Sequence, residues 1–327
     1  MAHDSPPSQL GARRAPDFFI VGQPKSGTTA LYEMLRSHPQ LYMPALKEPL
    51  FLANDLLAGL RWPTVRARPR TLDDYLSLFA AAAPGQRTGE ASALYLCSHQ
   101  AAGNIAKLAP AARIIAILRE PVSLVRSLHL QLLQDHSETE SDLSAALSLE
   151  GERREGKRIP RGCARPAALY YSEHTRYVEQ LRRYHDVFAS DQVLVVIYDD
   201  FRADNAAIVQ TVLRFLQVHD ESPAGPVDAN PTVRLRSRQL DEMVKNVTSG
   251  RGTVMRAVKA PVKTLTPRRV RRGALGAARR HLIYGEPRPL DPALELNLRR
   301  RYKPEVLALG EYLGRDLVSL WGYDSLD

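Results

Sequence analysis

A loop near the amino terminus combines residue types that bind phosphate. Residues 22–29 read GQPKSGTT, between an apolar run at Asp17–Gly22 (DFFIVG) and helical spacing over Ala30–Ser37. At a strand-to-helix junction, backbone N–H groups and the positive end of the helix attract an anion. Glycine allows close approach, lysine adds a charge, and two threonines add hydroxyl donors. We therefore predict a phosphate site here, with an ordinary strand–helix turn as the alternative.

The loop departs from the nucleoside-triphosphatase motif G-x-x-x-x-G-K-[ST] at its lysine. Gly22 and Gly27 have the required separation, but Thr28 stands where that motif has lysine. The lysine of this chain is Lys25, inside the loop. Apart from Val193–Asp199, no apolar run ends in an aspartate suited to hold magnesium. The loop is therefore expected to bind phosphate, but not Mg·ATP.

A second pair of side chains suited to an anion follows the apolar run Arg113–Leu118 (RIIAIL). Pro121 fits the first turn of a helix over Val122–Leu133. Ser127 then lies about two turns from Arg119. A guanidinium and a hydroxyl in this arrangement could share one phosphate. Taken alone, the pattern also fits an arginine at a strand end followed by an exposed serine.

Both segments resemble those of sulfotransferases that use 3′-phosphoadenosine-5′-phosphosulfate (PAPS). PKSGTT after an apolar strand is similar to the family's 5′-phosphosulfate loop, and ILREPVSLVRSLH is similar to its 3′-phosphate segment. The resemblance implies that one group of residues binds the 5′-phosphate: Lys25, Ser26, Gly27, Thr28 and Thr29. It implies that Arg119 and Ser127 contact the 3′-phosphate. Lys25 would also stabilise charge on the bridging oxygen as the sulfuryl group leaves.

A general base is expected between these segments, in the sequence KEPLF. The acceptor must lose a proton as it attacks sulfur, and Glu48 is suited to take it. Lys47 could lower the pKa of Glu48 or neutralise the leaving group; an exposed charged pair is the alternative interpretation. The heparan-type branch of the family carries Lys-Glu-x-His-Phe-Phe here, with the Glu as base. This chain matches at Lys47, Glu48 and Phe51 but has Leu50 and Leu52 for the His and the second Phe.

The resemblance continues elsewhere and leaves some roles open. Gly89–Ser92 is similar to a family strand that lines the cleft. Aryl and steroid sulfotransferases use a His base, for which His99 and His174 are the alternatives, although neither lies in a matching motif. Heparan-type members cover the nucleotide with a Lys-Gly-Arg loop, where this chain has Tyr284–Arg288. A contact from Arg251 or from the Arg268–Arg272 cluster could substitute for that loop.

A parallel sheet must position these residues. Apolar runs at Asp17–Gly22, Arg113–Leu118 and Gln192–Tyr198 alternate with segments of helical spacing, which favours parallel strands with helices on both faces. Weaker strand candidates lie at Leu41–Met43 and Arg87–Ala91. The predicted fold is α/β, with a P-loop-like central parallel sheet flanked by helices, as in sulfotransferases.

The remaining segments complete a single predicted domain over residues 17–327. Glu150–Pro166 is charged and holds Gly and Pro, so a surface loop is expected. Arg234–Arg280 is strongly basic and is interpreted as a mobile lid or a solvated face. A closing helix is expected over Pro292–Leu313. Variable loops at Ala53–Pro69 and Ser137–Tyr171 are expected to select the acceptor.

Composition limits the classes of ligand and compartment without deciding the function. The net charge of +9 attracts polyanions, which include nucleic acids, anionic membranes and phosphorylated ligands. Cys97 and Cys163 lack metal-ligand spacing, so two reduced thiols are expected. No run of about 18 apolar residues predicts a membrane span. Residues 1–16 lack the apolar core of a signal peptide, so a disordered leader and a cytoplasmic protein are expected.

These features predict an enzyme that moves a sulfuryl group from PAPS to a hydroxyl or amine of a glycan, glycolipid or secondary metabolite. The products are the sulfated acceptor and 3′-phosphoadenosine-5′-phosphate (PAP), and neither a metal nor a nucleic-acid partner is expected. One alternative is an ATP-dependent small-molecule kinase with an atypical phosphate loop, against which the displaced Lys25 argues. The other is a non-enzymatic nucleic-acid-binding protein, but Arg234–Arg280 lacks a recognition helix or stacking aromatics.

Overall fold

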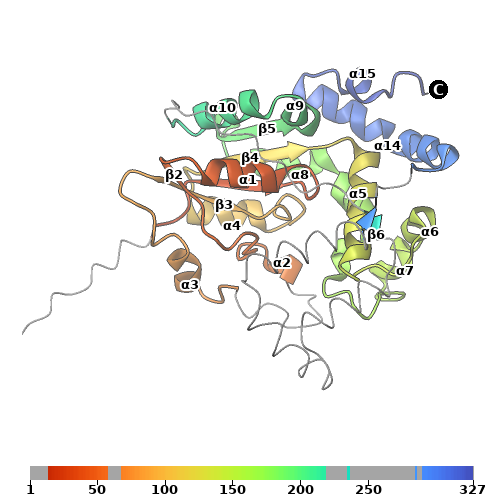
Figure 1. Cartoon of the computed structure of the whole chain (residues 1–327), viewed down its shortest axis with the longest axis horizontal. Coiled ribbons are helices and arrows are strands. Elements are labelled where there is room, and N and C mark those ends of the chain that lie inside the picture. Colours follow the sequence, from red (N-terminus) through yellow and green to blue (C-terminus); the bar gives the residue numbers. More distant parts are fainter. Residues whose placement is uncertain (1–13, 58–67, 219–233, 236–283, 286–288, 327) are drawn as a thin grey trace, which may run out of the picture.

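The centre of the molecule is a parallel sheet. The computed structural model describes residues 14–57, 68–218, 234–235, 284–285 and 289–326. Five strands pair in the order β2-β3-β1-β4-β5, all of them parallel (Figure 1). They are β1 (Phe18–Gly22), β2 (Leu41–Tyr42), β3 (Arg87–Ala91), β4 (Arg113–Leu118) and β5 (Val193–Ile197). The predicted α/β class and all five predicted strands are therefore confirmed.

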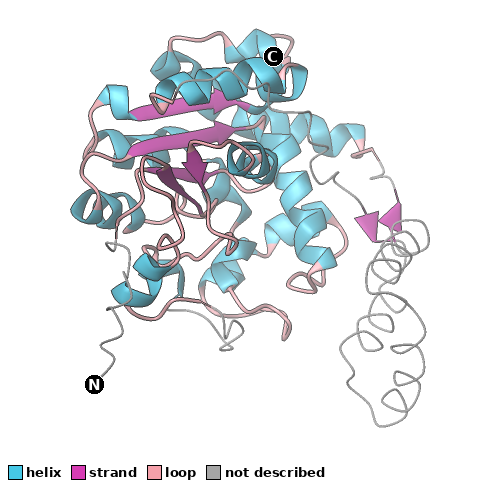
Figure 2. Cartoon of the chain, turned by 60° about the vertical axis from the view of Figure 1, so that its left-hand side comes forward, coloured by secondary structure: helices cyan, strands magenta, loops and turns pink. Residues whose placement is uncertain are grey.

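Helices cover both faces of the sheet (Figure 2). Alternate residues of β4 point to opposite sides, so Ile115 and Ile117 join one apolar cluster and Ile114 and Ala116 join the other. The first cluster is completed by α1 (Thr28–Arg36) and α10 (Asn205–Phe215). The second is completed by α4 (Ala101–Leu108), α5 (Pro121–Gln134), α8 (Tyr177–His185) and α14 (Pro292–Leu313). Continuous apolar strands such as RIIAIL arise because both of their faces are buried.

Shorter elements connect and cap these layers. The short α-helices are α2 (Asn54–Leu57), α3 (Leu72–Ser77), α6 (Leu143–Ser148), α7 (Glu150–Arg154), α9 (Tyr198–Ala203) and α15 (Leu317–Trp321). Three 3₁₀ turns lie at Pro166–Leu169, Tyr171–Thr175 and Ser190–Gln192. A separate antiparallel pair joins β6 (Arg234–Leu235) to β7 (Tyr284–Gly285). The closing helix α14 has the predicted bounds.

One predicted loop is wrong at its start. Glu150–Pro166 begins with the helix α7, where a surface loop was expected. The reason is tertiary: Arg153 is 1% exposed, and its guanidinium lies 2.8 Å from the carboxylate of Glu138. That buried ion pair and the packing of α7 outweigh the local charge and glycine content, which alone favour a loop.

Several predictions concern residues only partly described. Residues 1–13 of the predicted leader and 236–280 of the predicted basic lid lie outside the described residues, as do Arg268–Arg272 and residues 286–288. Cys97 and Cys163 are free thiols, as predicted. Among the described helices, none is long and apolar enough to cross a membrane. The cytoplasmic location stays a prediction.

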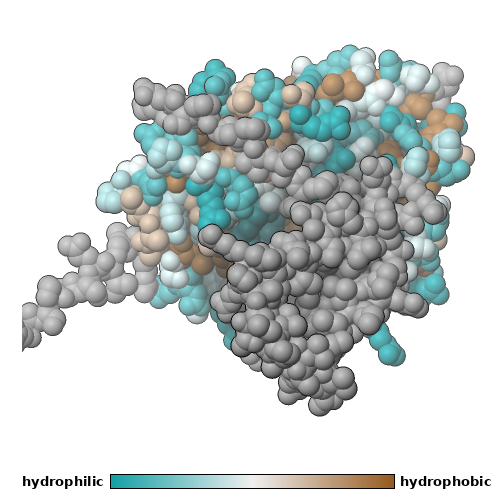
Figure 3. All heavy atoms as spheres, viewed as in Figure 1, coloured by the Kyte–Doolittle hydropathy of each residue, from teal (hydrophilic) through white to brown (hydrophobic). Residues whose placement is uncertain are grey.

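The connections bring the chemical groups together at one edge of the sheet. The chain leaves β1, returns through β2 and β3 on one side of it, and then crosses to β4 and β5 on the other. Ligands of open parallel sheets bind outside the carboxyl ends of the strands, where the strand order reverses in this way. The phosphate loop follows β1, and Arg119 follows β4. In the space-filling view, taken from the same side as Figure 1, hydrophilic side chains surround a recess in the surface (Figure 3).

Candidate active site

Two glycines shape the phosphate loop. A Cβ on Gly22 would lie 2.6 Å from Leu96 Cβ and 2.9 Å from the Ala93 carbonyl oxygen, so no side chain fits there. Gly27 begins α1 with φ 85°, and a Cβ there would lie 3.0 Å from the Phe201 ring. No side chain caps the first turn of α1. The N–H groups of that turn are therefore suited to bind an anion.

Two cations, which follow the ends of different strands, meet at this loop. Arg119 donates from Nη1 to the Lys25 carbonyl at 2.8 Å, and its guanidinium lies 4.7 Å from the centre of the Tyr198 ring. Lys25 donates from Nζ to Gln131 Oε1 at 3.0 Å. Burial, and then the charge of Arg119, lower the pKa of Lys25. Within the described residues neither cation makes a salt bridge, so an anion between them would relieve their repulsion.

The hydroxyl residues of the two segments differ in exposure. Ser26 is fully buried, with its Oγ 3.5 Å from the Pro24 carbonyl, and Thr28 is also buried. Thr29 is partly exposed. Ser127 is buried within α5, so the alternative of an exposed serine is wrong. The structure thus joins Arg119 to Lys25 directly and encloses both serines.

The Glu48 carboxylate is held on both of its oxygens. Lys47 Nζ lies 2.7 Å from Oε1, and the Ala93 N–H donates to Oε2 at 3.0 Å. The Glu48 N–H donates to the Ala91 carbonyl at 2.9 Å, and its backbone has φ 61°. The side chain remains 33% exposed, so a substrate hydroxyl could reach it. Over the described part of the chain, no hydrogen bond or ion pair joins Glu48 to Lys25; Ala93 lies between Glu48 and Gly22.

The two histidines have different surroundings. His174 is buried, with Nδ1 3.4 Å from Cys97 Sγ, and burial lowers its pKa to about 4. Such a group is a weak base. His99 is exposed, and its backbone N–H donates to the Asp55 carboxylate at 2.8 Å. Cys97 Sγ lies 3.5 Å from Gln23 Oε1, so Cys97 links His174 to the phosphate loop.

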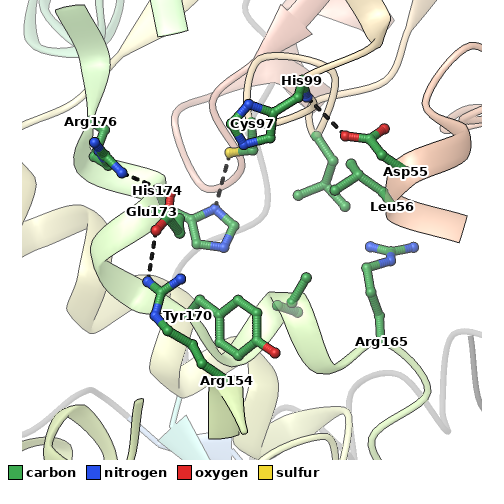
Figure 4. A pocket seen from close by; sticks show the side chains of 13 residues that line it. Asp55, Leu56, Cys97, His99, Arg154, Arg165, Tyr170, Glu173, His174 and Arg176 are labelled. Atoms are coloured by element: carbon green, nitrogen blue, oxygen red, sulfur yellow. Dashed lines mark hydrogen bonds and ion pairs between the residues drawn. The ribbon is translucent and has the colours of Figure 1, made fainter. Parts of the chain in front are cut away.

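A cavity of about 370 Å³ lies beside these groups. Cys97, His99, Tyr170 and His174 line it, together with Arg154, Arg165 and Arg176 (Figure 4). Arg154 and Arg176 pair with Glu173 at 2.7 and 3.6 Å. Arg165 makes no salt bridge to any described residue, and its Nε is buried without a hydrogen-bond partner. Burial and the charge of Arg68 lower the pKa of Arg165, and the charge of Glu48 opposes them. Arg165 therefore connects the cavity electrostatically to Glu48.

Sequence reasoning missed several residues of the site. Gln131 follows Ser127 by four residues on α5, so helical spacing could have placed both on one face. Glu120 caps α5 by accepting from the N–H groups of Val122 and Ser123 at 2.9 and 2.6 Å. An acidic residue before a helix-starting proline signals such a cap. Tyr198 gave no local signal, because its contact with Arg119 depends on the pairing of β4 with β5.

Comparisons with a family model and with individual known proteins agree on one family. The model of the family described as "Sulfotransferase family" matches residues 16–222. Human heparan sulfate glucosamine 3-O-sulfotransferase 6 is 35% identical over 123 residues, which are 38% of this chain and 32% of that protein. Human carbohydrate sulfotransferase 15 is 41% identical over 71 residues, which are 22% of this chain and 13% of that protein. The aligned regions thus span about a third or less of these relatives.

A solved structure shares the fold over nearly the whole chain. The crystal structure of a sulfotransferase from Alicyclobacillus acidocaldarius superposes with a TM-score of 0.68 and is 24% identical in sequence. The superposition covers 94% of this chain and 98% of that one. The likeness supports the architecture of the sheet and its flanking helices.

Proposed function

The chain belongs to the sulfotransferase family, whose matched residues 16–222 include both anion-binding segments, and from this we propose that it transfers a sulfuryl group from PAPS to an acceptor hydroxyl or amine. The observation that carries the proposal is the pair of partly buried cations, Lys25 and Arg119, at the uncapped start of α1. Neither makes a salt bridge in the described regions, and they follow the ends of two adjacent strands. A donor with phosphates at both ends of an adenosine suits that arrangement.

The donor would be held by the two segments. Lys25, Ser26, Gly27, Thr28 and Thr29 would surround the 5′-phosphosulfate, mainly through backbone N–H groups because Ser26 and Thr28 are buried. Arg119 and Ser127 would hold the 3′-phosphate. Arg119 uses one N–H on the Lys25 carbonyl and retains other donors for a phosphate oxygen.

The transfer would proceed by in-line displacement at sulfur. The acceptor oxygen or nitrogen forms a bond to sulfur while the bond from sulfur to the 5′-phosphate oxygen breaks, and PAP leaves. Glu48 takes the acceptor proton on its partly exposed carboxylate. Lys47 holds that carboxylate through their ion pair. Lys25 and the N–H groups of the loop stabilise the charge that develops on the leaving phosphate. No step requires a metal.

The acceptor would enter through the cavity lined by Arg165, whose charge interacts with that of Glu48. Its lining combines apolar side chains, such as Leu56 and Leu94, with tyrosine and arginine, a mixture suited to a ring carrying hydroxyl groups. A glycan, glycolipid or secondary metabolite would fit this description, and two similar proteins are named for carbohydrate or heparan sulfate substrates. Arg165, which makes no salt bridge among the described residues, would contact the acceptor.

Calorimetric titration with PAP, ADP and Mg·ATP tests the donor site. We expect PAP to bind more tightly than ADP, because only PAP carries the 3′-phosphate that Arg119 would bind. Arg119→Ala should lose most of this preference. Arg36→Ala is the matched control, since Arg36 is exposed at the far end of α1. Binding of Mg·ATP without binding of PAP would refute the proposal and favour a kinase.

A further inference from the structure

Glu90 is a carboxyl group buried inside the core. It lies on β3 opposite Phe19 of β1 and is 0% exposed. Its Oε2 accepts hydrogen bonds from the hydroxyls of Tyr75 and Tyr95 at 2.8 and 2.9 Å. Its Oε1 is buried and has no hydrogen-bond partner within the described structure. Burying a carboxyl group is costly, and an apolar residue here would avoid that cost. The two tyrosine bonds are therefore the feature that distinguishes Glu90 from an ordinary core residue.

The Tyr95 hydroxyl links Glu90 to the segment that carries Glu48. The backbone N–H of Leu52 donates to the Tyr95 oxygen at 3.1 Å. An N–H group can only donate, so the single proton of the hydroxyl is free to point to Glu90, which accepts it. Tyr75 reaches the same segment differently, because its ring stacks on Phe51 with centroids 4.7 Å apart. Glu90 thus fixes two tyrosines that hold consecutive residues of this segment.

The segment needs such support because its backbone is strained. Glu48 and Leu50 have backbone φ values of 61° and 53°, which residues other than glycine rarely adopt. Each such residue costs on the order of 1 kcal/mol or more and persists only where surrounding contacts hold it. Those contacts come from the end of β3 and the residues that follow it: the Glu48 N–H donates to the Ala91 carbonyl, and the Leu50 N–H donates to Ser92 Oγ at 3.1 Å. The hydrogen bond from the Leu52 N–H to the Tyr95 hydroxyl is a third contact of this kind.

We propose that Glu90 is a positioning residue for the transfer reaction, which fixes Tyr95 and Tyr75 and thereby holds the Glu48 carboxylate beside the phosphate loop. The proposal rests on the function proposed for Glu48, but its structural part does not depend on PAPS. Glu90 touches neither donor nor acceptor. It acts through the backbone of residues 48–52.

Burial raises the pKa of Glu90 to about 7 against the opposing effect of hydrogen bonds from Ser92, Tyr75 and Tyr95, and the charge of Glu48 is the smallest cause. A proton on the unpartnered Oε1 would leave both tyrosine bonds to Oε2 intact. The support is therefore compatible with either protonation state of Glu90. For the same reason, Glu90→Gln should retain much of it, since the amide oxygen can still accept both bonds.

Hydrogen–deuterium exchange of the full chain tests the proposal with a matched pair of variants. Tyr95→Phe and Tyr75→Phe each remove one hydroxyl from Glu90 Oε2, but only Tyr95 also accepts from Leu52. We expect Tyr95→Phe to speed exchange in residues 46–53 by about tenfold, which corresponds to one buried hydrogen bond. Tyr75→Phe should change it by less, because the stack on Phe51 remains. Residues 22–29 should exchange equally in both variants.

The kinetic readout separates positioning from general stability. With heparan sulfate as the acceptor probe, Glu90→Ala and Tyr95→Phe should lower kcat while the affinity for PAP stays constant, and Glu90→Gln should restore most of kcat. Equal protection of residues 46–53 from hydrogen exchange in Tyr95→Phe, Tyr75→Phe and the wild type would overturn the proposal. If the wild type binds no PAP, the proposed function fails instead, and the exchange experiment still decides whether Glu90 supports the segment.

Discussion

Replacing Glu48 by glutamine separates the effect of losing a proton acceptor from any effect on the stability of the fold. Glutamine has the same shape, and its amide oxygen can still accept from the Ala93 N–H, which lies 3.0 Å from Oε2. The substitution removes the base and the ion pair to Lys47. Because Glu48 is one-third exposed, that ion pair contributes no more than about 1 kcal/mol to stability. Loss of a general base lowers the rate by roughly 10²–10⁴-fold, or about 3–5 kcal/mol of activation free energy. The effect on kcat should therefore exceed the effect on stability.

The assay follows transfer of ³⁵S from labelled PAPS to heparan sulfate, with thermal unfolding and PAP titration on the same preparations. We expect kcat to fall at least about a hundredfold in Glu48→Gln. PAP affinity should be unchanged, because no described hydrogen bond joins Glu48 to Lys25. Glu33→Gln is the control, since Glu33 is an exposed acid on α1 whose only described partner is Arg36 at 3.7 Å. A kcat within threefold of the wild type would refute Glu48 as the base and direct attention to His99.

Three further predictions follow from the same contacts. Arg119→Lys should weaken PAP binding in calorimetry by about tenfold or more, because lysine cannot reproduce the forked guanidinium; an unchanged dissociation constant would remove Arg119 from the donor site. Gly27→Ala should destabilise the fold by about 1–2 kcal/mol in denaturant unfolding, because φ is 85° and Phe201 lies 3.0 Å from the new Cβ. Gly103→Ala in α4, with open space around it, should be neutral or stabilising, and equal effects would contradict the steric argument. Burial raises the pKa of Glu90 from 4.5 to about 7, so its protonated form favours folding. Stability should fall between pH 4.5 and 7 by up to roughly 3 kcal/mol relative to Glu90→Gln; parallel pH profiles would show that Glu90 is not the cause.

Much of the fold could be predicted because buried parallel strands have a simple sequence signature. The runs FFIVG and, after Arg113, IIAIL are apolar because both faces of β1 and β4 are covered by helices. The phosphate loop and Arg119 follow directly from these strands, so their place at the sheet edge was predictable. The helix α7 was not, because Arg153 gains a buried partner, Glu138, fifteen residues earlier in the chain. A charged residue gives no local sign of such a partner.

The candidate site could be predicted only where one short segment carries it. Lys25 and Arg119 were identified separately, but their direct hydrogen bond depends on the pairing of β1 with β4. Glu90 was visible only as part of a family-like strand, Gly89–Ser92. Its role depends on Tyr75 from α3 and Tyr95 from the loop after β3, which meet only in the folded chain. Long-range contacts of this kind leave no periodic pattern in the sequence.

Ala93 links Glu48, the proposed base, to the start of the phosphate loop. Its N–H binds the Glu48 carboxylate, and its carbonyl would lie 2.9 Å from any Cβ on Gly22, where the loop begins. The hydrogen bond and the close approach to Gly22 both involve the backbone of Ala93, so a shift of Ala93 would change the position of Glu48 relative to the loop. Under the proposed mechanism, the separation between the base and the donor would then depend on main-chain geometry. A side chain at Gly22 would clash with Leu96 and with the Ala93 carbonyl, and we expect it to displace the Ala93 N–H that holds the Glu48 carboxylate.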